Sequence, residues 1–549
     1  MEQRHARLLN GNFELEGISA RLTMRMATDL KTAIAQVTSV NPATGEVLGE
    51  TKCASETEVR AVVARARAAQ GAWAALGVRH RLDVVKKFQR HLQEQKGDVA
   101  RLIMREAGKP YVEALITEVM VVLDAAQFLI RHAYGLLRDE ALPHGNLAMK
   151  TKAGRIAREP HGVIGIVSPW NYPFSIPATE ALAALAAGNA VVVKPSEFTS
   201  LVVLELEKLL HSAGVPHDIF QVIVGDGATG AALIGSPIDK LIFTGSVATG
   251  KKVAQEAAAR FLPVVLELGG KDPMLVLDDA DVDVASSAAV WGAFVNAGQT
   301  CLSVERCYVH QSLYDRFLAA CVDKTKRLRV GNGADPETDV GPMIHERQLK
   351  IVEAQVQDAR KRGAHVLTGG QRLTELGMNF YAPTVLARMT HDMQVMREET
   401  FGPVLPIMSF QNDEEAVRLA NDSEFGLAAS VWTRDRARGE QIARRIHAGT
   451  VMVNDTVSCF GISEAPHGGV KASGVGRTHG KFGLEEMVRI KYIASDRLPG
   501  MKKVWWYGYG ERFHRQMEGF LDMQFARGLG ARVGGALRSA GVVRRKGQL

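Results

Sequence analysis

Short apolar runs rich in β-branched residues alternate with longer helical stretches through the first half of the chain. The runs are GVIGIVSP, NAVVVKPS, FQVIVGDG, KLIFTGS and PVVLELGG, and helical stretches such as ATEALAALAAG and LVVLELEKLLHSAG separate them. Strands and helices that alternate in this way form βαβ units, whose parallel sheet is covered by helices on both faces. The pattern therefore predicts a doubly wound α/β sheet from about residue 36 to residue 270, with ligands at the carboxyl ends of its strands.

A second series of the same kind runs from about residue 271 to residue 470. Its expected strands are PMLVLDD, RCYVHQ, AHVLTGG and GTVMVND, and SLYDRFLAACVDKTKRL has the apolar spacing of an amphipathic helix. Between Ala141 and Glu159 the chain has turn residues and rough alternation, which predicts a β-hairpin reaching out of the first domain.

Charge and cysteine content exclude several classes of protein. Residues 497–549 hold 11 Lys and Arg against 3 Asp and Glu, so the net charge of +7 belongs to this tail. The main body shows no basic stripe with interleaved aromatic residues, and we expect no nucleic-acid partner. Five scattered cysteines argue against a disulfide framework and favour a reducing, cytoplasmic location. No run is long and apolar enough for a spanning helix, and the first 34 residues lack the apolar region of a secretion signal.

Two glycine-containing turns are candidates for binding a dinucleotide. Gly225–Gly230, GDGATG, fits G-x-G-x-x-G, but no acidic residue follows at the expected distance, so a plain turn is an equal alternative. KLIFTGSVATGKKV is the better phosphate site, because a strand ends before Gly245 and a helix begins near Ser246. Lys194 and Glu197 of VVVKPSE follow another strand, where a carboxylate could accept both ribose hydroxyls. Glu197 would repel a ribose 2′-phosphate, which favours NAD over NADP.

Three further residues are candidates for catalysis. Asn171 of SPWNYPF offers an amide donor at a strand end, although the motif taken alone favours a structural role in a Pro-bounded turn. Glu267 of LELGGKDP could be a base whose pKa is raised by burial, or one partner of an ion pair. Cys301 and Cys307 of NAGQTCLSVERC lie too far apart for a redox pair or a zinc corner, and we expect no metal.

The motifs together resemble the aldehyde dehydrogenase superfamily over about residues 38–495. They are NPATGE, REAGKP, PWNYP, KPSE, FTGSVATG, ELGGKDP, GQTC, EETFGPV, VND and GGVKASGVGR, in the order and approximate spacing of that superfamily. The resemblance implies two doubly wound α/β domains, for the cofactor and for catalysis, with a small β-hairpin oligomerisation extension. It divides the chain into an extension (1–35), an NAD-binding domain (36–140 and 160–267), a catalytic domain (268–470), oligomerisation strands (141–159 and 485–496) and a basic tail (497–549).

The same resemblance assigns roles to residues. It makes Cys301 the nucleophile, Glu267 the base that activates the hydrolytic water, and Asn171 the oxyanion donor together with the Cys301 N–H. The presence of Glu267 favours a free acid over an acyl-coenzyme A product. The cofactor contacts implied are Trp170, Lys194, Glu197, Gly245 and Ser246 for adenosine and pyrophosphate, with Glu399 and Phe401 beside the nicotinamide ribose.

The expected activity is NAD-dependent oxidation of an aldehyde to its acid through a thiohemiacetal and a thioester on Cys301, in a homodimer or homotetramer. The alternatives are an NADP-linked enzyme, a succinate-semialdehyde type of dehydrogenase, or a non-catalytic scaffold that uses the basic tail.

Two residues depart from the family pattern. Thr478 stands where some relatives have a Glu that moves protons. His467 stands where Phe or Trp is usual, and either makes the substrate tunnel more polar or is satisfied by a backbone carbonyl.

The tail beyond residue 498 extends past the usual end of the family. Phe513, Met517, Phe520, Leu521 and Gln524 fall on one face of a helix, with basic residues and Trp505, Trp506 and Tyr507 nearby. Such a segment could contact a membrane surface peripherally, or it could pack on the enzyme or on a partner subunit. Several glycines weaken the expectation of a long helix.

Overall fold

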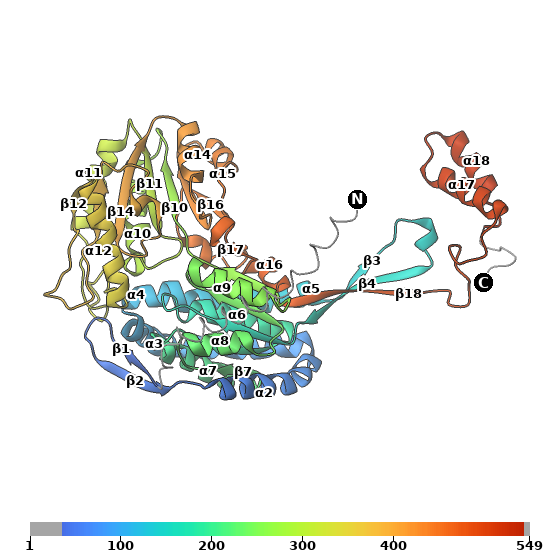
Figure 1. Cartoon of the computed structure of the whole chain (residues 1–549), viewed down its shortest axis with the longest axis horizontal. Coiled ribbons are helices and arrows are strands. Elements are labelled where there is room, and N and C mark those ends of the chain that lie inside the picture. Colours follow the sequence, from blue (N-terminus) through green and yellow to red (C-terminus); the bar gives the residue numbers. More distant parts are fainter. Residues whose placement is uncertain (1–35, 543–549) are drawn as a thin grey trace, which may run out of the picture. The chain divides into compact units, whose positions relative to one another are not determined.

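The computed structural model describes residues 36–542. The extension predicted over residues 1–35, and residues 543–549 of the tail, lie outside this range. Contacts divide the described chain into two units, drawn in Figure 1. Residues 36–137 and 160–489 form the larger unit, and residues 138–159 and 490–542 form the smaller one. No helix among the described residues is long and apolar enough to cross a bilayer.

The first sheet of the larger unit has six strands in the order β17-β9-β8-β5-β6-β7. They are β5 (Val163–Val167), β6 (Ala190–Lys194), β7 (Phe220–Val222), β8 (Lys240–Thr244), β9 (Val264–Glu267) and β17 (Gly474–Val475). All pairs are parallel except β17 with β9. The surrounding helices are α2 (Glu56–Ala75), α3 (Gly77–Ala107), α5 (Met120–Leu137), α6 (Ser175–Ala187), α7 (Ser200–Ser212), α8 (Gly227–Gly235), α9 (Val247–Ala258) and α16 (Gly480–Glu485).

The second sheet has seven strands in the order β12-β13-β14-β11-β10-β15-β16. They are β10 (Asp272–Val276), β11 (Val304–His310), β12 (His365–Thr368), β13 (Thr384–Ala387), β14 (Val404–Phe410), β15 (Ala428–Trp432) and β16 (Thr450–Val453). Figure 1 shows α11 (Tyr314–Lys326) and α12 (Glu346–Lys361) on one face, with α14 (Asp413–Asn421) and α15 (Arg436–Ala443) on the other. Each sheet has its own apolar core. The predicted α/β class with parallel sheets is confirmed.

The GDGATG turn is a helix cap in the structure. The Asp226 side chain accepts a hydrogen bond from the Ala228 N–H, and α8 begins at Gly227. Asp at this position satisfies an N–H that the first helical turn leaves without a partner. Ser246 caps α9 in the same way, by accepting from the Thr249 N–H. The helix start predicted near Ser246 is therefore confirmed.

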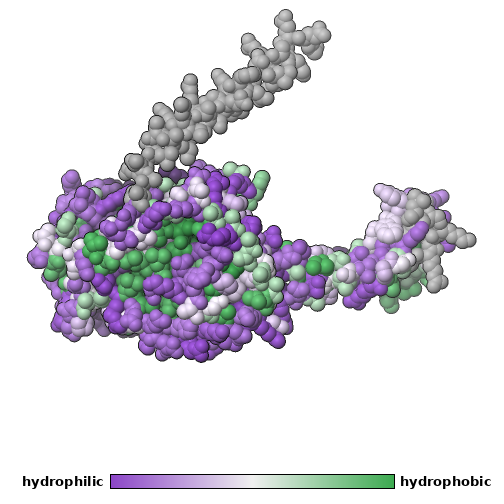
Figure 2. Space-filling view, turned by 90° about the horizontal axis from the view of Figure 1, so that it is seen from below, coloured by the Kyte–Doolittle hydropathy of each residue, from purple (hydrophilic) through white to green (hydrophobic). Residues whose placement is uncertain are grey.

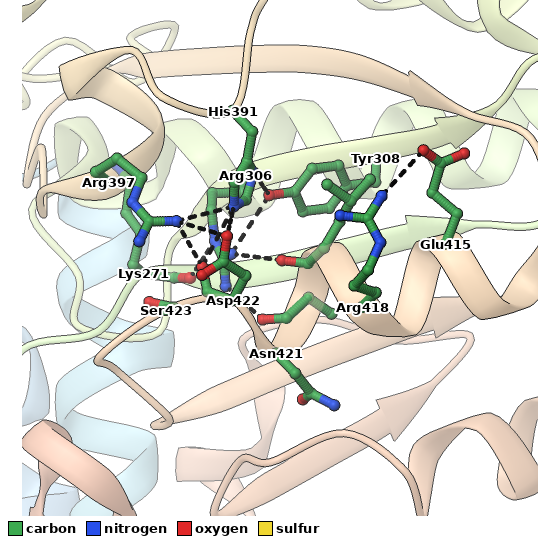
Figure 3. A network of polar contacts seen from close by, with 12 residues as sticks. Lys271, Arg306, Tyr308, His391, Arg397, Glu415, Arg418, Asn421, Asp422 and Ser423 are labelled. Atoms are coloured by element: carbon green, nitrogen blue, oxygen red, sulfur yellow. Dashed lines mark hydrogen bonds and ion pairs between the residues drawn. The ribbon is translucent and has the colours of Figure 1, made fainter.

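A buried arginine ties the second sheet to the loops beside it (Figure 3). The Arg306 guanidinium on β11 donates to the carbonyl oxygens of Lys271, Leu419 and Ala420. A guanidinium carries five N–H donors and no acceptor, so it satisfies several buried carbonyls at once. Arg306 therefore has a structural role, because its guanidinium donors are engaged by backbone carbonyls.

The smaller unit contains a three-stranded sheet and two helices. Strands β3 (Glu140–Leu142) and β4 (Lys152–Pro160) form an antiparallel hairpin, and β18 (Val488–Asp496) pairs with β4. The helices are α17 (Glu511–Phe525) and α18 (Leu529–Ser539). A Cβ at Gly535 would lie 2.3 Å from the Met523 nitrogen, so glycine permits the close packing of α17 on α18. Gly519, one of the glycines that weakened the helix prediction, is also a packing residue, because a Cβ there would lie 2.8 Å from the Gly535 carbonyl oxygen.

Candidate active site

Four adjacent parallel strands of the first sheet end at the same edge. The register pairs Val167 of β5 with Lys194 of β6, and Thr244 of β8 with Glu267 of β9. Trp170 and Asn171 follow β5, and Gly245 and Ser246 follow β8. The structure therefore gathers at the carboxyl edge of one sheet most of the site residues that were predicted from separate motifs.

The edge at β6 and β8 has donors and acceptors that suit a dinucleotide. The Lys194 ammonium is buried 3.6 Å from the more exposed Glu197 carboxylate. A carboxylate suits a ribose diol, and the N-terminus of the 12-residue helix α9 suits a pyrophosphate. A side chain at Gly245 would have its Cβ 2.7 Å from the Phe243 ring, so this turn is closed to larger residues. These groups fit a nicotinamide dinucleotide.

The EETFGP segment reaches the same region from the second sheet. Glu305 accepts hydrogen bonds from the backbone N–H groups of Thr400 and Phe401, and Lys271 forms a buried ion pair with Glu305. The Phe401 ring meets the Trp170 ring edge-on, with centroids 5.4 Å apart. Glu305 and Lys271, which the sequence analysis did not single out, therefore fix Phe401 against Trp170.

The Glu399 side chain of this segment is buried and points toward Gly270. Its carboxylate accepts a hydrogen bond of 2.9 Å from the Gly270 N–H, next to the Glu267 strand. Burial raises the Glu399 pKa to about 8, with a smaller contribution from Glu305. The segment is thus held to both sheets through buried polar contacts.

The loop before Cys301 adopts a rare backbone conformation. Asn296 and Ala297 have positive φ angles of 53° and 55°. A Cβ at Gly298 would lie 2.2 Å from the Gly402 carbonyl oxygen, so only glycine fits there. Non-glycine residues at positive φ persist where the surroundings hold them, and such strain clusters at functional sites.

A buried polar network holds this loop against Asn171. The Asn171 Nδ2 donates to the Gln299 carbonyl at 3.0 Å, and the Asn296 Nδ2 donates to the Asn171 carbonyl at 2.9 Å. Lys109 also donates to the Asn171 carbonyl, at 2.8 Å, and forms a fully buried ion pair of 2.7 Å with Glu118. The ion pair and the amides together fix the two segments that carry Asn171 and Cys301.

The two cysteines of NAGQTCLSVERC have different surroundings. Cys307 lies on β11 with no exposed surface, inside the second core. Cys301 precedes β11 and is half-buried, at the wall of a cavity of about 190 Å³. Burial raises the pKa of both thiols, and Asp272, Glu399 and Glu267 raise that of Cys301 further. Only Cys301 combines access to a cavity with nearby carboxylates.

Glu267 is a buried carboxyl group at the end of β9. Neither of its oxygens has a hydrogen-bond partner among the described residues 36–542. Desolvation raises its pKa well above the usual value, and Glu180 raises it further while Arg477 lowers it. The predicted rise in pKa is confirmed, and the alternative of a simple ion pair is not what the structure shows.

His467 lies beside Glu267 and not in the cavity wall. Its Nε2 is 3.7 Å from a Glu267 oxygen, and its Nδ1 has no partner within the described chain. Burial lowers the His467 pKa to about 3, so the ring is neutral. Neither interpretation given for this residue holds, because the ring lines no part of the Cys301 cavity and bonds no carbonyl. Its backbone pairs with that of Thr478.

Glu180 is a residue of this site that sequence reasoning missed. It is a buried carboxyl group on the mostly apolar helix α6, and burial raises its pKa to about 8. It lines a small internal cavity with Thr478 and His479. The available signal was a lone Glu inside the Ala-rich stretch ATEALAALAAG, where a charge has no solvated face.

Comparison with known proteins agrees with this geometry. The model of the aldehyde dehydrogenase family matches residues 30–493. A 4,4'-diapolycopene aldehyde oxidase from Methylomonas sp is 40% identical over 491 residues, covering 88% of this chain and 91% of the relative. A putative succinate-semialdehyde dehydrogenase [NADP(+)] from Mycolicibacterium smegmatis is 38% identical over 456 residues, covering 83% and 88%.

Solved structures give the same result. The NAD+ complex of an aldehyde dehydrogenase from Bacillus cereus has a TM-score of 0.80 and 34% identity, covering 84% of this chain and 93% of that one. This chain belongs to the aldehyde dehydrogenase family, whose members oxidise aldehydes with a nicotinamide cofactor.

Proposed function

We propose that this protein oxidises an aldehyde to its carboxylic acid at Cys301, with NAD as the preferred cofactor. The observation that carries the proposal is the placement of Cys301. It lies on a loop that is hydrogen-bonded to Asn171, and it lines a cavity. The charge of Glu267 raises the pKa of its thiol. Nucleophile, oxyanion donor and base are thus within one site of a family that oxidises aldehydes.

Each group has a role that its surroundings permit. The Cys301 sulfur attacks the aldehyde carbon, and the raised pKa of the thiol means that its proton must leave as the bond forms. Asn171 uses one amide N–H for the Gln299 carbonyl, which leaves its second N–H for the oxyanion. A bound nicotinamide cofactor would supply the hydride acceptor, and oxidation of the Cys301 thiohemiacetal would leave a thioester on the sulfur.

Hydrolysis of the thioester is assigned to Glu267. Its carboxylate oxygens have no partner in the described protein, and burial makes the ionised group a stronger base than a solvated carboxylate. It therefore takes a proton from the attacking water and yields the free acid. A scaffold without catalysis has no use for this combination of groups.

Replacing Cys301 separates its role from that of Cys307. Cys301→Ala is expected to lower kcat/KM for aldehyde oxidation by at least about 10³-fold, because no nucleophile remains. Cys307→Ala is the matched control and should keep most of the activity. Formation of reduced cofactor measures both, and substantial turnover by Cys301→Ala would refute the assignment.

Removing the Glu180 carboxylate should change the pH dependence. Glu267 is active when ionised, so activity rises with pH through its raised pKa. Glu180→Gln removes a group that raises this pKa, and the rising limb of the pH profile should move to lower pH. Glu464→Gln, at an exposed position, is the control. If the rising limb of the pH profile stays at the same pH in Glu180→Gln, the proposed effect of Glu180 on the Glu267 pKa is refuted.

The preference for NAD rests on Glu197. Its carboxylate beside Lys194 would repel a ribose 2′-phosphate. We expect Glu197→Gln to lower the ratio of kcat/KM with NAD to that with NADP by at least about 10-fold, since 1.4 kcal/mol corresponds to a factor of ten. An unchanged ratio would assign cofactor choice to other residues.

We also propose that the chain acts as a homodimer or homotetramer. Strands β3 and β18 are the edges of the small sheet, and unpaired edges can extend into the sheet of another copy. Figure 2 shows a broad hydrophobic area on one face of the larger unit, and such areas often mark contacts between proteins. Five free cysteines fit a reducing compartment.

A peripheral membrane contact through the tail is a second candidate property. Phe513 is buried within the smaller unit, while Leu521, Phe525, Leu529 and Leu537 are exposed on α17 and α18. Exposed apolar side chains on a strongly basic segment fit an anionic lipid surface.

Vesicles of anionic phospholipid should co-sediment the full chain more strongly than a chain of residues 1–498. Vesicles of zwitterionic lipid should show a smaller difference, because basic residues contribute only on a charged surface. Equal sedimentation of the two chains on anionic vesicles would exclude the contact.

A further inference from the structure

The cavity at Cys301 is lined by apolar side chains and by no charged one. Its wall includes Met120, Ile176, Trp291, Val295, Leu302 and Phe460. Apolar walls around a reacting group select an apolar ligand, because each buried methylene gains free energy and each buried polar group without a partner loses it.

The few hydroxyl groups in the wall already have partners. The Tyr172 hydroxyl bonds to Thr300 Oγ1 at 2.8 Å. Thr117 Oγ1 donates to the Glu113 carbonyl at 2.7 Å, and Ser458 Oγ donates to the Asp455 carboxylate. These contacts lie within the protein, so the wall offers little to a polar substrate.

Two buried cations, Lys109 and Arg306, are also engaged elsewhere. The Lys109 ammonium is held by Glu118 and the Asn171 carbonyl, and lies 4.0 Å from the centre of the Tyr172 ring. Arg306 bonds backbone carbonyls within the second sheet. Neither residue lines the cavity. A carboxylate at the far end of a substrate would therefore be buried without a counter-charge, which is strongly unfavourable.

An exposed apolar strip continues from the cavity to the surface. Val112, Ile116 and Met120 are spaced four residues apart along one helical run and are 56%, 41% and 55% exposed. The run includes a π-helical segment at Leu115–Val119, and all three side chains are exposed along it. Trp291 of α10 (Val282–Phe294) is 41% exposed. Ile116, Met120 and Trp291 line the cavity as well, so the strip and the cavity are continuous.

We infer that the substrates are long-chain apolar aldehydes. The aldehyde group reaches Cys301, the first part of the hydrocarbon chain fills the cavity, and the rest lies along the strip formed by Val112, Ile116 and Met120. The inference rests on the proposed oxidation at Cys301 and adds the substrate class to it. It also disfavours a dicarboxylic semialdehyde, a choice that the names of the relatives leave open.

The first test measures kcat/KM of the full-length protein for straight-chain aldehydes from acetaldehyde to dodecanal and for succinic semialdehyde. A rise of about fourfold for each methylene that becomes buried is expected, with succinic semialdehyde below pentanal. Equal values at all lengths, or succinic semialdehyde as the best substrate, would overturn the inference. Absence of turnover with every aldehyde would instead refute the proposed oxidation itself.

The second test places a charge on the strip. Met120→Arg should lower the ratio of kcat/KM for dodecanal to that for acetaldehyde by at least about 10-fold, because the chain then meets a solvated cation. Met378→Arg is the matched control, since Met378 is 75% exposed and lies outside the cavity wall, and its ratio should not change. Ile116→Ser replaces Met120→Arg if thermal unfolding shows that the arginine variant does not fold. An unchanged ratio in the folded strip variant would overturn the inference.

Discussion

The buried ion pair between Lys109 and Glu118 is the contact on which the arrangement of the active site depends. Lys109 also bonds the Asn171 carbonyl, and the second Glu118 oxygen accepts from the Phe174 and Ser175 N–H groups at the start of α6. The pair therefore fixes the segment that carries Asn171. Removing one partner of such a pair costs about 3–5 kcal/mol, because the other charge remains buried.

Burial of the groups around Cys301 and Glu267 explains the remaining features of the site. Burial raises the pKa of Glu267, and raises that of Glu180 and Glu399 to about 8. The same surroundings keep His467 neutral, so this ring adds no positive charge beside Glu267. The walls of the cavity at Cys301 are likewise mostly apolar and carry no charged side chain. The proposed substrate class and the raised pKa of Glu267 thus have one physical cause, which is the low polarity around Cys301 and Glu267.

Much of the fold and site was predictable from local pattern. Strands with β-branched runs, and the capping residue Ser246, are properties of short segments, and the structure has them where expected. The electrostatic effect of Glu180 on Glu267 was not predictable, because it depends on how α6 packs near the end of β9, which no local pattern encodes. The prediction for His467 was wrong for the same reason, since its place beside Glu267 depends on contacts between distant segments. In the tail, Gly519 was among the glycines that predicted a weak helix, but it lies where α17 packs closely on α18.

The most direct test of the account uses Glu267→Gln in a single turnover with a long-chain aldehyde. The account predicts a burst of one equivalent of reduced cofactor per site, slow further turnover, and an acyl group on the peptide that contains Cys301, found by mass spectrometry. Steady turnover at the rate of the unmodified protein, or an acyl group on another residue, would contradict it.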